Sequence, residues 1–170
     1  YIRPIKRLLR YMYYNVIKLP DGSLFISFDK RIRIFKDGRL YKIKGIENNF
    51  RILRSACAMD KRGNLFFGEY VNYKERSNIN IYCLGFGEYK IEKLYSFTKG
   101  SIKHIHGIYY DPFEEKLWCL TGDKGSECRI LSTSNNFSSF DIIGEGDESW
   151  RAVSLLFTKD SLYYATDAEY

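Results

Sequence analysis

The feature that most constrains this chain is a polar turn followed by a short apolar strand, a signature that recurs along the sequence. Each copy contains a leucine on which the copies can be aligned: Leu24, Leu65, Leu117 and Leu162. These leucines are separated by 41, 52 and 45 residues, and blades of a β-propeller repeat at about 40–50 residues. A β-sandwich also uses many short strands but has no fixed period. The recurrence therefore favours a propeller.

The segment from residue 101 to residue 140 shows most fully what one repeat contains. Polar turns, one of them at Pro112, separate short apolar runs at residues 104–110, 117–120, 128–132 and 140–143. Proline lacks the N–H that a strand interior donates, so it marks a turn. Four short strands joined by tight turns form an antiparallel meander, which is the blade of a propeller.

We therefore predict an all-β fold, a β-propeller or propeller fragment with about four blades of four-stranded antiparallel meanders. A single domain covers residues 1–170, with blades at residues 13–50, 51–98, 101–145 and 149–170, the last one incomplete. Four blades are the lower limit for a closed ring. We expect further blades from additional sequence or from a second copy, and self-association through open blade edges.

The charge distribution is uneven, since residues 1–54 carry fourteen basic and four acidic residues. A basic half can attract polyanions. The alternation of Arg31 and Arg33 with isoleucines is typical of a solvated strand face, so we do not expect a nucleic-acid partner. No apolar run is long enough for a membrane-spanning helix, so we expect no membrane span. The four cysteines lack C-x-x-C spacing and are predicted to be buried reduced thiols.

Polar residues recur at fixed distances from the aligned leucines. Eleven residues before each leucine stand Tyr13, Arg54, His106 and Arg151. Five residues after them, or one step away, stand Asp29, Glu69, Tyr70, Asp123 and Asp167. The first strand of each blade lines the channel of a propeller, so these groups predict a small-ligand or saccharide site at its axial mouth. The competing interpretation is that they pair with one another and only tie blades together.

Both histidines of the chain, His104 and His106, lie two residues apart and face the same side of their strand. Together with Asp123 they could share a metal ion, since imidazole and carboxylate are both metal ligands. Two ligands at this spacing are common in strands, and the chain has no third histidine. We therefore predict no metal site and no cofactor.

A short motif lies between the third and fourth predicted strands of the 101–145 unit. Residues 133–140, TSNNFSSF, resemble the Asp box, Ser/Thr-x-Asp-x-Gly-x-x-Trp/Phe. Thr133 and Phe140 match, whereas Asn135 replaces Asp and Phe137 replaces Gly. The chain thus resembles the BNR/Asp-box (sialidase-like) β-propellers of the BNR repeat-containing glycosyl hydrolase superfamily, most clearly over residues 101–167. The resemblance implies a structural hairpin at this motif.

The resemblance also implies roles for the polar residues of the predicted channel. Arg54 and Arg151 would clamp a sugar carboxylate, although a third channel arginine is missing. Asp123 or Asp167 would act as the acid, and Tyr70 with Glu69 would supply the nucleophile. The substrate-binding set is completed by the histidine pair, His104 and His106.

Two functions fit the sequence best, and a third, polyanion binding by the basic residues of the segment 1–54, predicts binding that weakens steeply with salt. The first is a glycan-directed, sialidase-like propeller that binds a saccharide or another small anionic ligand at its axial channel, with glycoside hydrolysis as an extension. The second is a non-catalytic scaffold for protein interactions. A ligand site would leave Arg54, His106, Arg151 and Asp123 converging on open solvent, whereas a scaffold would bury them as mutual partners.

Overall fold

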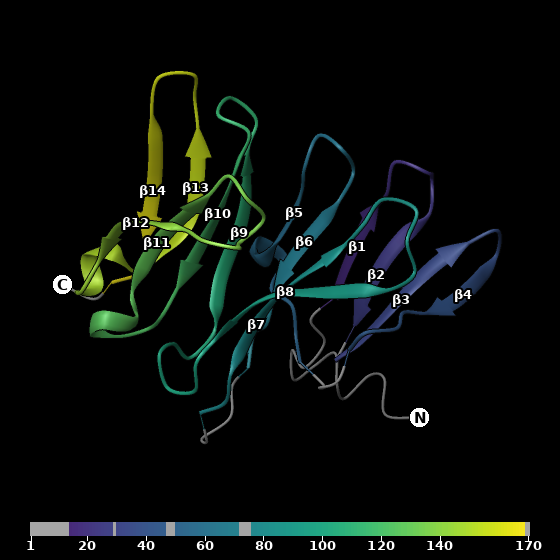
Figure 1. The fold of residues 1–170 in the computed structure, drawn as a ribbon, viewed down its shortest axis with the longest axis horizontal. Coiled ribbons are helices and arrows are strands. Elements are labelled where there is room, and N and C mark those ends of the chain that lie inside the picture. The colour runs from purple at the N-terminus through teal and green to yellow at the C-terminus, as the bar shows by residue number, and fades with distance from the viewer. Residues whose placement is uncertain (1–13, 29, 47–49, 72–75, 169–170) are drawn as a thin grey trace.

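The computed structural model of the chain describes residues 14–28, 30–46, 50–71 and 76–168. In these segments it contains three four-stranded antiparallel sheets and one two-stranded hairpin. Each sheet is formed by consecutive strands in chain order, which is the meander of a propeller blade. The all-β propeller fold predicted from the sequence is confirmed, as an open series of blades (Figure 1). No helix in the described segments is long and apolar enough to cross a membrane.

The first sheet consists of β1 (Tyr14–Lys18), β2 (Leu24–Phe28), β3 (Arg31–Lys36) and β4 (Arg39–Lys42). The second follows the 3-10 helix η1 (Arg54–Ala56) and consists of β5 (Cys57–Met59), β6 (Leu65–Gly68), β7 (Ile79–Leu84) and β8 (Ile91–Phe97). The third consists of β9 (Ile105–Asp111), β10 (Lys116–Thr121), β11 (Arg129–Thr133) and β12 (Asp141–Glu145), with η2 (Gly125–Glu127) between its second and third strands. After η3 (Glu148–Trp150), β13 (Ala152–Phe157) and β14 (Leu162–Thr166) form the hairpin.

The aligned leucines all lie at the beginning of the second strand of their sheet. A local turn explains the regularity, because an aspartate side chain accepts a hydrogen bond from the backbone N–H two residues ahead. The three pairs are Asp21 with Ser23 at 3.0 Å, Asp60 with Arg62 at 2.9 Å and Asp111 with Phe113 at 2.8 Å. Such a turn is specified by its own residues and leads directly into the strand.

Apolar side chains between neighbouring sheets form the core. Phe25 of the first sheet packs against Phe67 of the second, with ring centroids 5.5 Å apart. Between the third sheet and the hairpin, a smaller apolar cluster surrounds Trp118 and Leu155. The first sheet and the hairpin lie at opposite ends of the fan (Figure 1). The hairpin leaves Leu156 64% and Tyr163 58% exposed, which is typical of an edge that another blade would cover.

The first strands of neighbouring sheets face the shared inner side of the fan. Strand β9 packs against β5 on one side and against β13 on the other. Of the four residues aligned eleven positions before the leucines, His106 lies within its first strand, but Arg54 lies in η1 and Arg151 just before β13. Tyr13 lies outside the described residues. The aligned residues that the structure describes therefore lie before or at the beginning of the first strand of each unit, and not in the middle of that strand.

Candidate functional site

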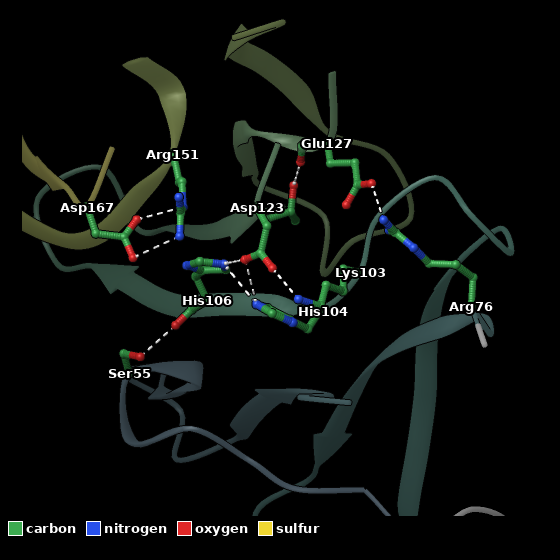
Figure 2. A network of polar contacts seen from close by, with 10 residues as sticks. Ser55, Arg76, Lys103, His104, His106, Asp123, Glu127, Arg151 and Asp167 are labelled. Carbon is green, nitrogen blue, oxygen red and sulfur yellow. Dashed lines mark hydrogen bonds and ion pairs between the residues drawn. The ribbon is translucent and has the colours of Figure 1, made fainter. Parts of the chain in front are cut away.

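Three polar side chains converge at the beginning of β9. His104 and His106 are 3% and 7% exposed, and they point to the same face because side chains alternate along a strand. Their Nε2 atoms lie 3.0 Å apart. The loop after β10 brings Asp123 Oδ1 to 3.1 Å from both of these nitrogens. Figure 2 shows the three side chains meeting at one point. The sequence interpretation placed the histidines on one face and Asp123 within reach, and the structure brings all three together.

A lysine holds the other oxygen of this aspartate. Lys103 Nζ donates to Asp123 Oδ2 at 2.6 Å. Burial raises the pKa of Asp123, but the hydrogen bond from Lys103 and the neighbouring imidazoles outweigh burial and lower the pKa to about 2. Asp123 is therefore a carboxylate at neutral pH, with its side chain 20% exposed to solvent.

The environment of His104 keeps its imidazole neutral. Burial lowers the pKa of His104 to about 4, although the Asp123 carboxylate acts in the opposite direction. The ring of Tyr70 packs on it, with centroids 4.3 Å apart. Nδ1 of His104 is buried and has no hydrogen-bond partner of acceptable geometry, although the backbone of Val71 lies close enough to favour protonation. A neutral imidazole has a free lone pair, so His104 can act as a base or as a metal ligand.

The loop that carries Asp123 is held by a glycine turn, by hydrogen bonds to backbone carbonyls and by one ion pair. Gly122 has φ +83°, and a Cβ at this residue would lie 1.9 Å from the backbone oxygen of Glu127, so the loop requires glycine here. Thr121 Oγ1 donates to the same oxygen at 2.8 Å. Arg76, which precedes β7, forms an ion pair of 2.7 Å with the Glu127 side chain. Ser55 Oγ donates to the carbonyl of His106 at 2.6 Å, which joins β9 to η1. Asp123 is thus held in place by the backbone as well as by Lys103.

The two arginines of the predicted clamp, Arg54 and Arg151, have different surroundings in the structure. Arg151 is paired with Asp167 through contacts of 2.8 Å from Nε and 3.4 Å from Nη2. This pair lies at the entry to β13, the strand that packs against β9, and it is drawn with the histidines in Figure 2. Arg54 is exposed in η1. The structure therefore brings one of the two arginines to the neighbouring inner strand as part of an ion pair.

Glu69 and Tyr70, the predicted nucleophile pair, point into different surroundings. Glu69 is 2% exposed, and its carboxylate accepts hydrogen bonds from Asn80 N at 2.9 Å, Asn80 Nδ2 at 3.1 Å and Tyr82 Oη at 2.7 Å. Burial raises the pKa of Glu69, against the effect of these hydrogen bonds. Tyr70, in contrast, packs on His104 at the site. Their predicted catalytic roles stay predictions.

The Asp-box-like segment forms a compact polar turn between β11 and β12. Asn135 Oδ1 accepts from the backbone of Ser139 at 3.0 Å, and Thr133 Oγ1 lies 2.6 Å from the Ser139 carbonyl. Phe137 is fully buried with φ +64°. Phe140 packs edge-on against Tyr95 of the second sheet, with ring centroids 4.9 Å apart. The segment is structural in this chain, as a hairpin of this kind would be, and membership of the BNR family stays a prediction.

Lys103, Thr121 and Glu127 also belong to the site, yet the sequence analysis did not identify them. Lys103 does not lie at one of the fixed distances from the aligned leucines, and its contact with Asp123 depends on how the loop after β10 closes. Gly122 directly before Asp123 was the available signal, since a glycine after a strand commonly marks a tight turn.

Two searches by sequence add no relative: no described protein family matches the chain, and no curated protein does. Among solved structures, the chain is similar to a crystal structure from Thermus thermophilus that is described as a proposed oxidoreductase (glucose dehydrogenase). The two share 17% sequence identity with a TM-score of 0.43. The match covers 71% of this chain and 46% of the other, so the chain spans less than half the length of that structure.

Proposed function

We propose that this chain is part of a glycan-directed propeller that binds a saccharide, or another small anionic ligand, beside its inner strands. The observation that carries the proposal is the inner polar cluster, a set of cationic, imidazole and carboxylate side chains around β9 and the entry to β13. Its members are Lys103, His104, His106, Asp123, Arg151 and Asp167. Binding sites for polar ligands bring together a few such groups from different elements, beside an apolar or aromatic wall.

The exposure of the inner polar cluster supports access by a ligand. The side chains of Asp123 and Arg151 are 20% and 22% exposed, and that of Asp167 is 47% exposed. The half-buried ring of Tyr70, which packs on His104, supplies an aromatic face on which an apolar face of a sugar can pack. The guanidinium of Arg151 matches a carboxylate bidentately, and an acidic ligand would share or replace its contact with Asp167. Hydrolysis with Asp167 as acid, together with Tyr70 and Glu69, is the extension of this proposal, because Asp123 is already a carboxylate at neutral pH and has no proton to donate.

One observation favours the scaffold alternative. The groups of the inner polar cluster already pair with one another, Lys103 with Asp123 and Arg151 with Asp167. Pairs of this kind can serve only to satisfy charges between strands. In that case the chain would be a non-catalytic propeller scaffold for protein interactions, and its open hairpin edge would be the partner-facing surface.

Binding of a panel of acidic and neutral oligosaccharides to the folded protein tests the proposal. Arg151→Ala is the informative variant, and Arg129→Ala is its matched control. Arg129 forms an ion pair with Glu145 at side-chain exposures of 24% and 44%, close to the 22% and 47% of Arg151 and Asp167. The pair of Arg129 joins β11 to β12, the two strands farthest from β9 in the third sheet, and Arg129 Nε also donates to the Ser126 carbonyl at 3.0 Å.

The expected result is saturable binding that Arg151→Ala removes and Arg129→Ala retains. Circular dichroism and the oligomeric state of each protein show that the fold is intact. If the folded wild-type protein binds nothing in the panel, or if both variants lose binding equally, the scaffold becomes the better account.

A further inference from the structure

The inner polar cluster contains a triangle of three potential metal-ligand atoms. Its corners are His104 Nε2, His106 Nε2 and Asp123 Oδ1, and its sides measure 3.0, 3.1 and 3.1 Å. In a zinc site, ligand atoms lie about 2.0–2.2 Å from the ion, so neighbouring ligands about 90–109° apart at the metal are separated by about 3.0–3.5 Å. The triangle therefore has the size of one face of a coordination polyhedron.

Hydrogen bonding alone explains this triangle less well. A neutral imidazole has one N–H, and its other ring nitrogen carries a lone pair. If both Nε2 atoms donate to Asp123 Oδ1, two N–H groups crowd onto one oxygen while the nitrogens lie 3.0 Å apart. If one Nε2 is deprotonated, it can accept from the other Nε2 at 3.0 Å, but its lone pair still lies 3.1 Å from a carboxylate oxygen. A cation in the middle of the triangle removes this conflict, because all three lone pairs then point at positive charge.

The surroundings have the features of an outer ligand shell. A carboxylate that binds a metal through one oxygen usually has its other oxygen hydrogen-bonded, and Lys103 donates to Asp123 Oδ2 at 2.6 Å. A histidine that binds through Nε2 carries its proton on Nδ1. Nδ1 of His104 is buried and has no hydrogen-bond partner of good geometry, so it is not engaged as an acceptor and can carry that proton.

We propose that His104, His106 and Asp123 form a mononuclear site for a divalent transition-metal ion of the Zn²⁺ class. Two imidazoles and one carboxylate suit zinc, iron, cobalt or nickel, whereas Ca²⁺ and Mg²⁺ prefer oxygen ligands throughout. Three protein ligands leave at least one coordination position open, as in catalytic rather than structural zinc sites. Sequence reasoning predicted no metal because a third histidine is missing. In this arrangement the loop after β10 supplies the third ligand as a carboxylate.

The inference does not rest on saccharide binding, because the probe is the metal ion alone. Tag-free, chelator-treated protein is titrated with Zn²⁺ and Co²⁺ by calorimetry and visible absorption, with Ca²⁺ and Mg²⁺ in parallel. We expect one equivalent of Zn²⁺ or Co²⁺ to bind, and no comparable binding of Ca²⁺ or Mg²⁺. The chain has only two histidines, so a site with imidazole ligands can be at no other place.

Three variants locate the ion. His106→Gln and Asp123→Asn each remove one ligand and should weaken binding by more than about 100-fold, beyond the effect of an outer-shell change. Lys103→Ala removes only the positioning contact to Asp123 and should weaken binding about 10-fold. Lys61→Ala is the control, because Lys61 forms an exposed ion pair with Glu115 away from the site, and binding should be unchanged.

Histidine labelled with ¹⁵N gives a readout in the wild-type protein that needs no variant. Zn²⁺ should shift the Nε2 resonances of both imidazoles and fix the proton on Nδ1. The proposal is overturned if the folded protein does not bind Zn²⁺ or Co²⁺ saturably, or if binding leaves both imidazoles unshifted. Thiolate charge-transfer absorption of the Co²⁺ form, which would place the ion on cysteine, would overturn it as well.

Discussion

The carboxylate of Glu69 offers a quantitative test of the hydrogen bonding inside the second blade. Glu69→Ala removes an acceptor that receives three hydrogen bonds from Asn80 and Tyr82 inside the sheet. Each buried donor that loses its acceptor costs about 1–3 kcal/mol. Release of the carboxylate from burial recovers part of this cost. We expect the free energy of unfolding to fall by about 3 kcal/mol.

Urea unfolding followed by circular dichroism measures this loss. With an m value of about 2 kcal/mol/M, the midpoint should fall by about 1.5 M. Glu92→Ala is the matched control, because Glu92 is exposed on β8 of the same sheet, and it should change stability by less than about 0.5 kcal/mol. A loss below about 1 kcal/mol for Glu69→Ala would show that the Glu69 carboxylate is not needed as the acceptor, because Asn80 and Tyr82 would then have adequate replacement partners.

Three further predictions concern pH, blade packing and the polar turn. Burial raises the pKa of Glu69 in the folded state above its ordinary value of 4.5. The wild type should therefore lose stability relative to Glu69→Gln as pH rises from that value through the folded pKa, and urea midpoints across pH measure this loss. A stability difference that stays constant with pH would contradict the raised pKa. Gly68→Ala would place a Cβ 2.7 Å from Ile105 of the neighbouring blade, so thermal unfolding should show that the free energy of unfolding falls by about 1–3 kcal/mol. An unchanged midpoint would mean that the blades are not packed as described. Asn135→Ala removes the acceptor for Ser139 N and should lower the free energy of unfolding by about 1 kcal/mol. Asn135→Asp keeps an acceptor oxygen and should retain most of the wild-type stability in the same urea assay. Equal losses in the two variants would show that the side-chain oxygen does not hold the turn.

Local features of the sequence predicted the blades, because the turns are built from neighbouring residues. Asp21, Asp60 and Asp111 each bond the backbone two residues ahead, so a reading of adjacent residues finds these turns and the strands that follow them. The common face of His104 and His106 followed from strand alternation in the same way.

Contacts set by loop closure and strand register could not be predicted. The partner of Glu69 is Asn80 because residue 68 pairs with residue 81 across β6 and β7, and neighbouring residues alone do not specify such a register. Arg54 was assigned to a first strand, but a 3-10 turn places it before β5. Asp123 reaches the histidines only because Gly122 adopts φ +83° and its loop closes on Glu127.

Anomalous diffraction from crystals of tag-free protein grown with Zn²⁺, recorded on both sides of the zinc absorption edge, tests most directly that the inner polar cluster is a ligand site. We expect one strong peak within coordinating distance of His104 Nε2, His106 Nε2 and Asp123 Oδ1, with an open position on the solvent side. A map without a peak at these three atoms, or with its main peak at a cysteine, would show that His104, His106 and Asp123 do not form a metal site.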